Sequence, residues 1–148
     1  MGHQPVKSVK RVISFLLVVL AVVVIWTSQS LASNSDEDAE IQDTILRQFE
    51  AFANNDSEQA WALASEGIQR RFGSSQVFVD MVRLAYPAVH NATAIEFSDR
   101  VPHGGFDIQI VKLKGPEGER WDVYYRMVMA DGLWKIAGVR LQPAEPGI

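Results

Sequence analysis

Cysteine is absent from this sequence of 148 residues. Disulfides, thiolate metal sites and cysteine nucleophiles are therefore excluded. The sequence also lacks any catalytic, metal-binding or nucleotide-binding motif specific enough to name a reaction, and neither a metal nor a cofactor is expected. A domain without disulfides depends on its hydrophobic core for stability. With 47% hydrophobic residues and a length typical of one domain, the chain can supply such a core.

Acidic residues are missing from the first 32 positions, where Lys7, Lys10 and Arg11 are the only Lys or Arg residues. Because three of the 14 Lys and Arg residues lie there, 11 remain against 18 Asp and Glu residues in the rest of the chain. Residues 33–148 therefore have a net charge of −7. An acidic domain repels phosphate backbones, so nucleic acid is not an expected partner.

The N-terminal segment has the layout of a secretory signal peptide. Its basic residues precede an apolar run over 12–26, and small residues follow at Ser30 and Ala32. We expect cleavage after Ala32, which would give an exported, periplasmic or extracellular protein with an intact mass beginning at Ser33. The alternative is an uncleaved anchor in the inner membrane, although the run of 15 residues is shorter than the roughly 20 of a typical span. Both place the domain outside the cytoplasm, because the basic end stays inside.

Helical signals dominate the first half of the remaining chain. Residues 33–40 are predicted to be a linker that becomes the start of a helix, and apolar residues then recur at helical spacing from Ile41. Asp56, followed three residues later by Gln59, is typical of a helix N-cap. A third helix is expected to start at Ser74 or Ser75 and to end before a proline.

Strand signals dominate the second half. Four segments rich in β-branched and aromatic residues are separated by glycine-containing turns, at residues 92–97, 106–113, 121–129 and 133–141. Three helices followed by an antiparallel meander predict an α+β domain over 41–142, with the helices packed on one face of a curved four-strand sheet. Residues 143–148 are expected to be a tail.

The Asp131–Gly132 turn predicts the register of the last two strands. A two-residue turn of this type pairs Ala130 with Leu133, Met129 with Trp134 and Met127 with Ile136. The face toward the helices would then contain Val123, Tyr125, Met127, Met129, Trp134 and Ile136. The outer face would contain Tyr124, Arg126, Val128, Leu133, Ala137 and Val139. A β-bulge would exchange these sets, because a shift of one residue reverses the faces.

The chain resembles the bacterial family called domain of unknown function 4864, within the nuclear-transport-factor-2-like superfamily. The residues that carry the resemblance are Gln48–Phe52, Asp56, Ala60–Trp61, Ala64–Ser65, Phe72–Gly73, Phe78, Met81–Val82, Tyr86–Pro87 and Asp131–Ile136. The resemblance implies a cone-shaped α+β fold with a cavity between the helices and the concave face of the sheet. It implies no activity, because the superfamily contains enzymes, binding proteins and dimerisation modules.

Three aromatic residues, Tyr86, Tyr125 and Trp134, are the candidates for lining this pocket. The competing interpretation is that they are ordinary core aromatics. Two sets of residues could instead support acid–base chemistry. The first is His103 with an upstream carboxylate, Glu96 or Asp99, and the second is Asp107 and Asp122 with Tyr124.

Three functions remain open. The first is a non-enzymatic module that binds a small apolar ligand or a protein partner, and the second is a small isomerase or dehydratase that uses a pocket carboxylate or His103. The third is a structural homodimer that pairs through Tyr124, Arg126 and Val128 on the outer face of the sheet. Arg126 is expected to pair with Asp122 or to pack its stem on a partner subunit.

Overall fold

The structure is a computed structural model that describes residues 33–146. The predicted targeting segment, residues 1–32, lies outside the described residues, so its cleavage stays a prediction. No helix within 33–146 is long and apolar enough to cross a membrane. The chain divides into two compact units, Met1–Glu37 and Asp38–Ile148, and the second contains the whole sheet.

The first half of the chain is helical, and polar side chains cap several of its helices. Residues 33–53 are helical, and four further helices follow: α2 (Ser57–Ala62), α3 (Glu66–Phe72), α4 (Ser75–Ala85) and α5 (Pro87–His90). The Asp56 side chain accepts a hydrogen bond from the Gln59 N–H at 3.0 Å, which confirms the predicted cap. Ser65 and Ser74 cap α3 and α4 in the same way. The separate helices α3 and α5 were not predicted.

Residues 33–40, predicted to be a linker that becomes the start of a helix, are helical throughout. Ala39 and Glu40 are strong helix formers, and the neighbouring carboxylates do not oppose a helix. Asp38 is moreover held by an ion pair with Arg100, which lies on the first strand. This tertiary contact is invisible to a prediction that uses local sequence alone.

The second half forms a four-stranded antiparallel sheet, as predicted. Its strands pair in the order β1-β2-β3-β4, and their bounds are Ala94–Pro102, Asp107–Lys114, Arg120–Ala130 and Leu133–Pro143. Asp131 and Gly132 have φ of 52° and 76°, the left-handed values that a tight two-residue turn requires. The pairs Ala130 with Leu133, Met129 with Trp134 and Met127 with Ile136 all form, which confirms the predicted register next to the turn.

A β-bulge then changes the register. Arg126 pairs with Gly138 whereas Met127 pairs with Ile136, so Ala137 is an additional residue in β4. Val139 consequently pairs with Tyr125 and packs against the core, which corrects its predicted place on the outer face. Met129, predicted to face the helices, is 49% exposed because it lies beside the turn at the end of the hairpin.

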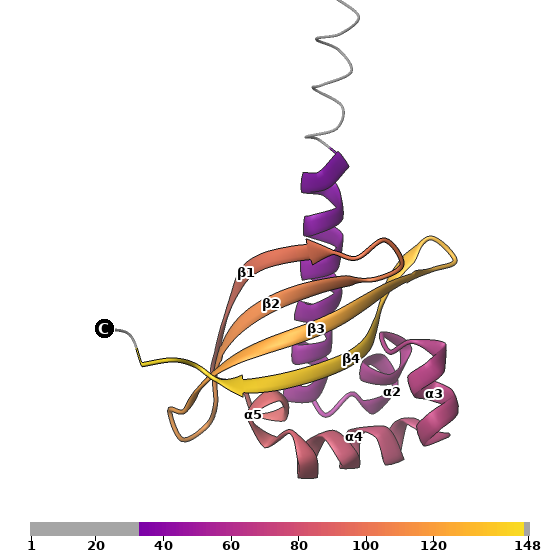
Figure 1. Cartoon of the computed structure of the whole chain (residues 1–148). Helices are drawn as coiled ribbons and strands as arrows, with labels where there is room; N and C mark the ends of the chain where they lie inside the picture. The colour runs from indigo at the N-terminus through magenta and orange to yellow at the C-terminus, as the bar shows by residue number, and fades with distance from the viewer. Residues whose placement is uncertain (1–32, 147–148) are drawn as a thin grey trace, which may run out of the picture. The chain divides into compact units, whose positions relative to one another are not determined.

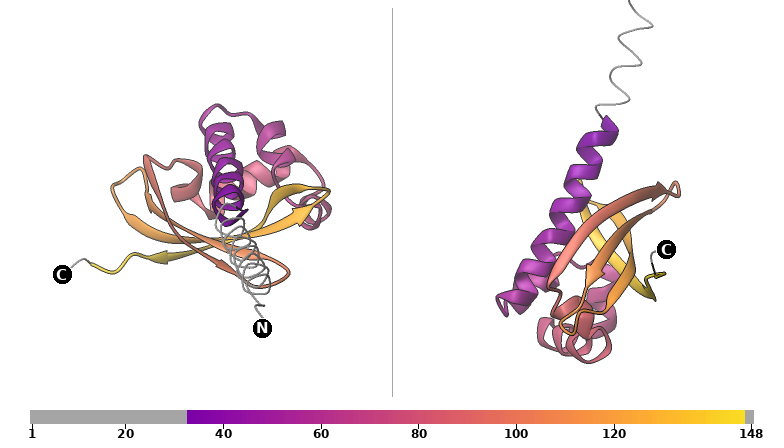
Figure 2. Two further views of the ribbon diagram at one scale, coloured as in Figure 1. Left: turned by 90° about the horizontal axis from the view of Figure 1, so that it is seen from above. Right: turned by 90° about the vertical axis from the view of Figure 1, so that its left-hand side faces the viewer.

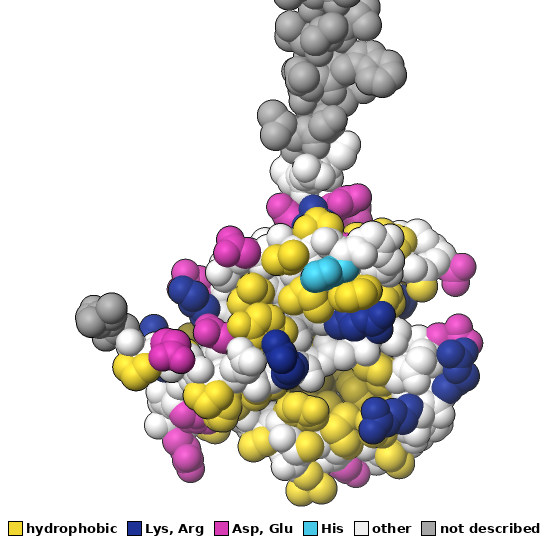
Figure 3. Space-filling model, viewed as in Figure 1, with side chains coloured by type: hydrophobic (Ala, Val, Ile, Leu, Met, Phe, Trp, Pro, Cys, Tyr) yellow, Lys and Arg dark blue, Asp and Glu magenta, His cyan; other side chains and the backbone are white. Residues whose placement is uncertain are grey.

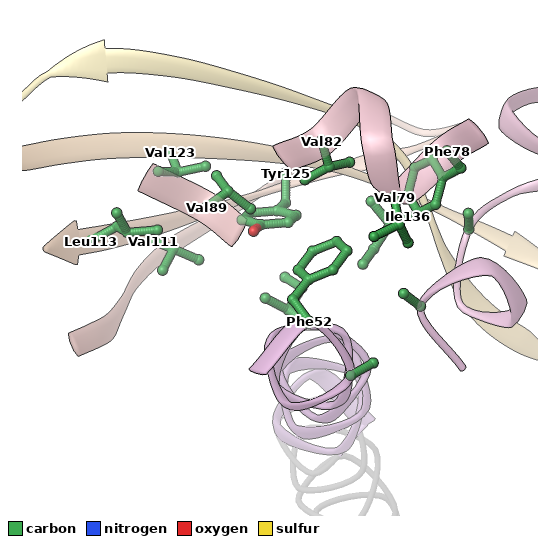
Figure 4. Close-up of a cluster of buried hydrophobic side chains, with 14 of the residues drawn as sticks. Phe52, Phe78, Val79, Val82, Val89, Val111, Leu113, Val123, Tyr125 and Ile136 are labelled. Atoms are coloured by element: carbon green, nitrogen blue, oxygen red, sulfur yellow. The ribbon is translucent and has the colours of Figure 1, made fainter. Parts of the chain in front are cut away.

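Within the unit Asp38–Ile148, the helices lie on one face of the curved sheet, as Figures 1 and 2 show. The core between them contains Ile41, Ile45, Phe52, Phe78, Val82, Val111, Val123, Tyr125, Met127 and Ile136. In Figure 4, the ring of Phe52 points from the first helix toward Tyr125 on the sheet. Every member of this core lies within Asp38–Ile148, so this unit has its own hydrophobic core and is expected to fold without the N-terminal segment.

Candidate ligand pocket

A pocket of about 480 Å³ lies between α3, α4, the end of the first helix and β4. Its apolar lining contains Phe52, Ile68, Phe72, Phe78, Met81, Val82, Ala85, Tyr86, Val89, Ile136, Ala137 and Val139. Its polar side chains are Gln48, Ser65, Arg71 and Arg126, and Gly67 and Gly138 complete the wall. Figure 3 shows a hollow lined by hydrophobic side chains beside β4, with Lys and Arg side chains on either side of it. Small-molecule sites typically occupy about 300–1,000 Å³, so the volume suits a small organic ligand.

Backbone hydrogen bonds fix β4 against the helices at the edge of this pocket. The Ser65 N–H donates to the Ile136 carbonyl at 2.8 Å, and the Ile136 N–H donates to the Leu63 carbonyl at 3.0 Å. The bulge follows directly after Ile136, so the next two residues of β4 line the pocket. Gly138 is paired with Arg126, and a Cβ atom on Gly138 would lie 3.9 Å from the Cβ atom of Arg126.

Two polar side chains in the lining are buried and hold the wall together. Gln48 is 3% exposed, and its Nε2 donates to the Ala60 carbonyl at 3.3 Å. The Ser65 hydroxyl accepts from the Ile68 N–H at 3.4 Å as the cap of α3. These groups therefore position the helices that form the pocket.

The two arginines of the lining are exposed and bear no ion pair to any residue of the described chain. The Arg71 guanidinium lies 5.5 Å from the centre of the Phe72 ring, and that of Arg126 lies 4.4 Å from the centre of the Phe106 ring. Arg126 was predicted to pair with Asp122 or a partner subunit. Within this chain it stacks on Phe106 instead, because that ring lies on the same face of the sheet.

The three predicted pocket residues take different places. Tyr86 lines the pocket. Tyr125 is 1% exposed in the centre of the core, and burial raises the pKa of its phenol far above the usual value. Trp134 packs, half-buried, against the core. Neither Tyr125 nor Trp134 belongs to the lining of this pocket, which lies closer to α3 and α4 than the sequence suggested.

The predicted acid–base residues lie elsewhere. His103 is exposed in the loop between β1 and β2, and its ring stacks on Phe106 with centroids 4.9 Å apart.

Asp107 is buried in an ion pair with Arg100, and Asp122 lies opposite Gln142 on β4. Glu96 and Asp99 are exposed on β1, and Tyr124 lies beneath the Arg140 guanidinium on β3. In the described part of the chain, no cluster of three His, Asp or Glu residues could hold a metal ion.

Sequence reasoning missed the contribution of α3. No helix was predicted between Asp56 and Ser74 other than the one that Asp56 caps, whereas Ser65 caps a further helix that Gly73 ends with a φ of 77°. This helix brings Ile68, Arg71 and Phe72 to the pocket. Ser65 before this segment and Gly73 after it are the sequence signals from which the helix could have been predicted.

Comparisons with known proteins agree with this fold. The family model described as "Domain of unknown function (DUF4864)" matches residues 34–147. A crystal structure of an NTF-2-like protein of unknown function from Silicibacter pomeroyi DSS-3 is similar, with a TM-score of 0.53 and 16% sequence identity. The match covers 75% of this chain and 98% of that one. No protein of curated function matches the sequence significantly. At this identity, the similarity to the solved structure shows the fold alone.

Proposed function

Since the chain belongs to the domain of unknown function 4864 family and has an NTF2-like fold, we propose from its pocket that it binds a small ligand with a largely apolar body. The observation that carries this proposal is the lining, in which apolar side chains from α3, α4 and β4 surround about 480 Å³. Sites of this size and composition bind small molecules chiefly by burying their apolar surface.

The position of the titratable groups favours binding over the alternative of an isomerase or dehydratase. General acid–base catalysis requires a group within about 3 Å of the proton that it transfers. Among the described residues that line the pocket there is no aspartate, glutamate or histidine. Asp107 is paired with Arg100, and His103 stacks on Phe106 at an exposed loop.

Blocking the pocket should abolish binding of an uncharged apolar probe. N-phenyl-1-naphthylamine fluoresces strongly in apolar surroundings, and its binding can be titrated with protein that begins at Ser33. Ala85→Trp places a large side chain in the pocket from an exposed position on α4, so the fold is retained. We expect the affinity for the probe to fall by at least about tenfold, or 1.4 kcal/mol.

Leu84→Trp is the matched control, because Leu84 is the preceding residue of α4, is 82% exposed and does not line the pocket. This variant should keep the wild-type affinity. Wild-type protein that does not bind the probe, or equal binding by the two tryptophan variants, would overturn the proposal.

A second proposal, homodimerisation, is favoured by the outer face of the sheet. The described helices cover the opposite face (Figure 2). Half-buried apolar side chains lie on adjacent strands of the outer face, where Ile110 is paired with Tyr124 and Ile108 with Arg126. Val128 is a half-buried neighbour on the same face. A monomer rarely leaves such a continuous apolar face to water, so a second copy is the expected occupant.

Val128→Glu should separate the proposed dimer, because two-fold symmetry would bring two buried, unpaired carboxylates together near the centre of the interface. Sedimentation of protein that begins at Ser33 measures the result. The wild type should be a dimer at tens of micromolar and the variant a monomer. Leu84→Glu, which makes the same charge change on α4, should remain a dimer. A monomeric wild type would show that the outer face does not self-associate.

A further inference from the structure

The charge of the pocket is opposite to that of the domain. Residues 33–148 have a net charge of −7, yet the lining of the pocket contains two arginines and, among the described residues, no carboxylate. Four other arginines, Arg47, Arg70, Arg83 and Arg100, each form an ion pair with an aspartate or a glutamate. Arg71 and Arg126 differ from these four arginines in having no ion pair to any residue of the described chain.

The two arginines of the lining belong to different elements. Arg71 belongs to α3, and Arg126 belongs to β3 opposite Gly138 of β4. Each is stacked on an aromatic ring, which restricts its side chain while leaving the N–H groups at the guanidinium edge available. Arg120 and Arg140 also have no ion pair in the described chain, but neither lines the pocket.

We infer that the ligand of this pocket is an anionic amphiphile, with an apolar body among the side chains of α4 and β4 and an oxyanion head bound by Arg71 and Arg126. Guanidinium groups bind carboxylate, sulfonate and phosphate oxygens through paired hydrogen bonds. The inference rests on the proposed function, because it assigns a head group to a ligand whose body occupies the same pocket. It also explains why a strongly acidic domain keeps a cationic pocket.

Two matched probes test the anionic head group independently of the apolar pocket. 8-Anilino-1-naphthalenesulfonate has the same aromatic body as N-phenyl-1-naphthylamine and adds one sulfonate. The sulfonate probe should bind at least about fivefold more tightly than the uncharged probe, the factor expected for one exposed charge pair of about 1 kcal/mol. The difference should shrink as salt is raised, because exposed charges are screened.

Charge-removing variants then locate the head group. Arg71→Gln and Arg126→Gln should each lower the affinity for the sulfonate probe by about fivefold more than they lower the affinity for the uncharged probe. Arg70→Gln is the control, since Arg70 is the preceding residue of α3 but pairs with Glu66 and does not line the pocket. Arg126 also lies on the proposed dimer face, so sedimentation of Arg126→Gln checks that its assembly is unchanged.

The outcomes are distinct. If both probes bind equally and the arginine variants have no effect, the anionic head is wrong while the apolar pocket stands. If Arg70→Gln weakens binding of the sulfonate probe as much as Arg71→Gln does, the effect is one of overall charge, and the assignment of the head group fails. If neither probe binds, the proposed function itself is wrong.

Discussion

Tyr125→Ala should lower the free energy of unfolding by about 3–5 kcal/mol, the cost typical of removing a large aromatic side chain from a core. Tyr125 is 1% exposed, and its ring meets the edge of Phe49 with centroids 6.0 Å apart. Its side chain fills the space between β3 and the first helix, so its loss would leave a cavity between the sheet and the helix. Chemical denaturation of protein that begins at Ser33 measures the effect.

Tyr124→Ala is the matched control, because Tyr124 is the preceding residue of β3 and points to the opposite face. Its side chain is half-buried beneath Arg140, so we expect a loss of roughly 1 kcal/mol. Equal losses for the two tyrosines, or a larger loss for Tyr124→Ala, would contradict the assignment of the two faces of β3.

Arg100→Met should be similarly destabilising, by about 3–5 kcal/mol, because it leaves a buried carboxylate without its partner. The side chains of Arg100 and Asp107 are only 9% and 10% exposed, and Arg100 also pairs with Asp38 on the first helix. Methionine keeps most of the length of the side chain while removing its charge. Denaturation of the variant measures the loss, and adding Asp107→Asn should recover part of it.

Arg47→Met is the control for this ion pair. Arg47 pairs with Asp43 one helical turn away, and both side chains are at least half exposed. Exposed pairs of this kind contribute about 0–1 kcal/mol, so the variant should be close to the wild type. A loss below about 1 kcal/mol for Arg100→Met would mean that the ion pairs of Arg100 with Asp107 and Asp38 contribute no more than exposed pairs do.

The sequence predicted the features of this fold that have strong local causes. The Asp131–Gly132 turn requires positive φ at both positions, so it determined the pairing of the adjacent residues of β3 and β4. The cap at Asp56 was predictable for a similar reason, since its side chain accepts a hydrogen bond from the backbone three residues later. The alternating residues of β3 then identified Val123, Tyr125 and Met127 as core.

The pocket was harder to predict because its residues meet only in the folded chain. The bulge at Ala137 moves Val139 into the lining, and a single additional residue leaves almost no trace in the alternation of β4. Arg71 and Arg126 are far apart in the sequence, and each alone is typical of a solvated surface. Trp134 was predicted to line the pocket because it is aromatic, but it packs against the core instead.

The pocket between α3, α4 and β4 is proposed to bind the apolar body of a ligand. Two-dimensional ¹H–¹⁵N NMR of protein that begins at Ser33, recorded as N-phenyl-1-naphthylamine is added, tests it most directly. If the probe occupies this pocket, the amide signals of Gly67, Ala85 and Gly138, one from each of these elements, should shift together and saturate together. Shifts confined to Ile108, Ile110 and Val128 on the outer face of the sheet, or no saturable shift at all, would contradict it.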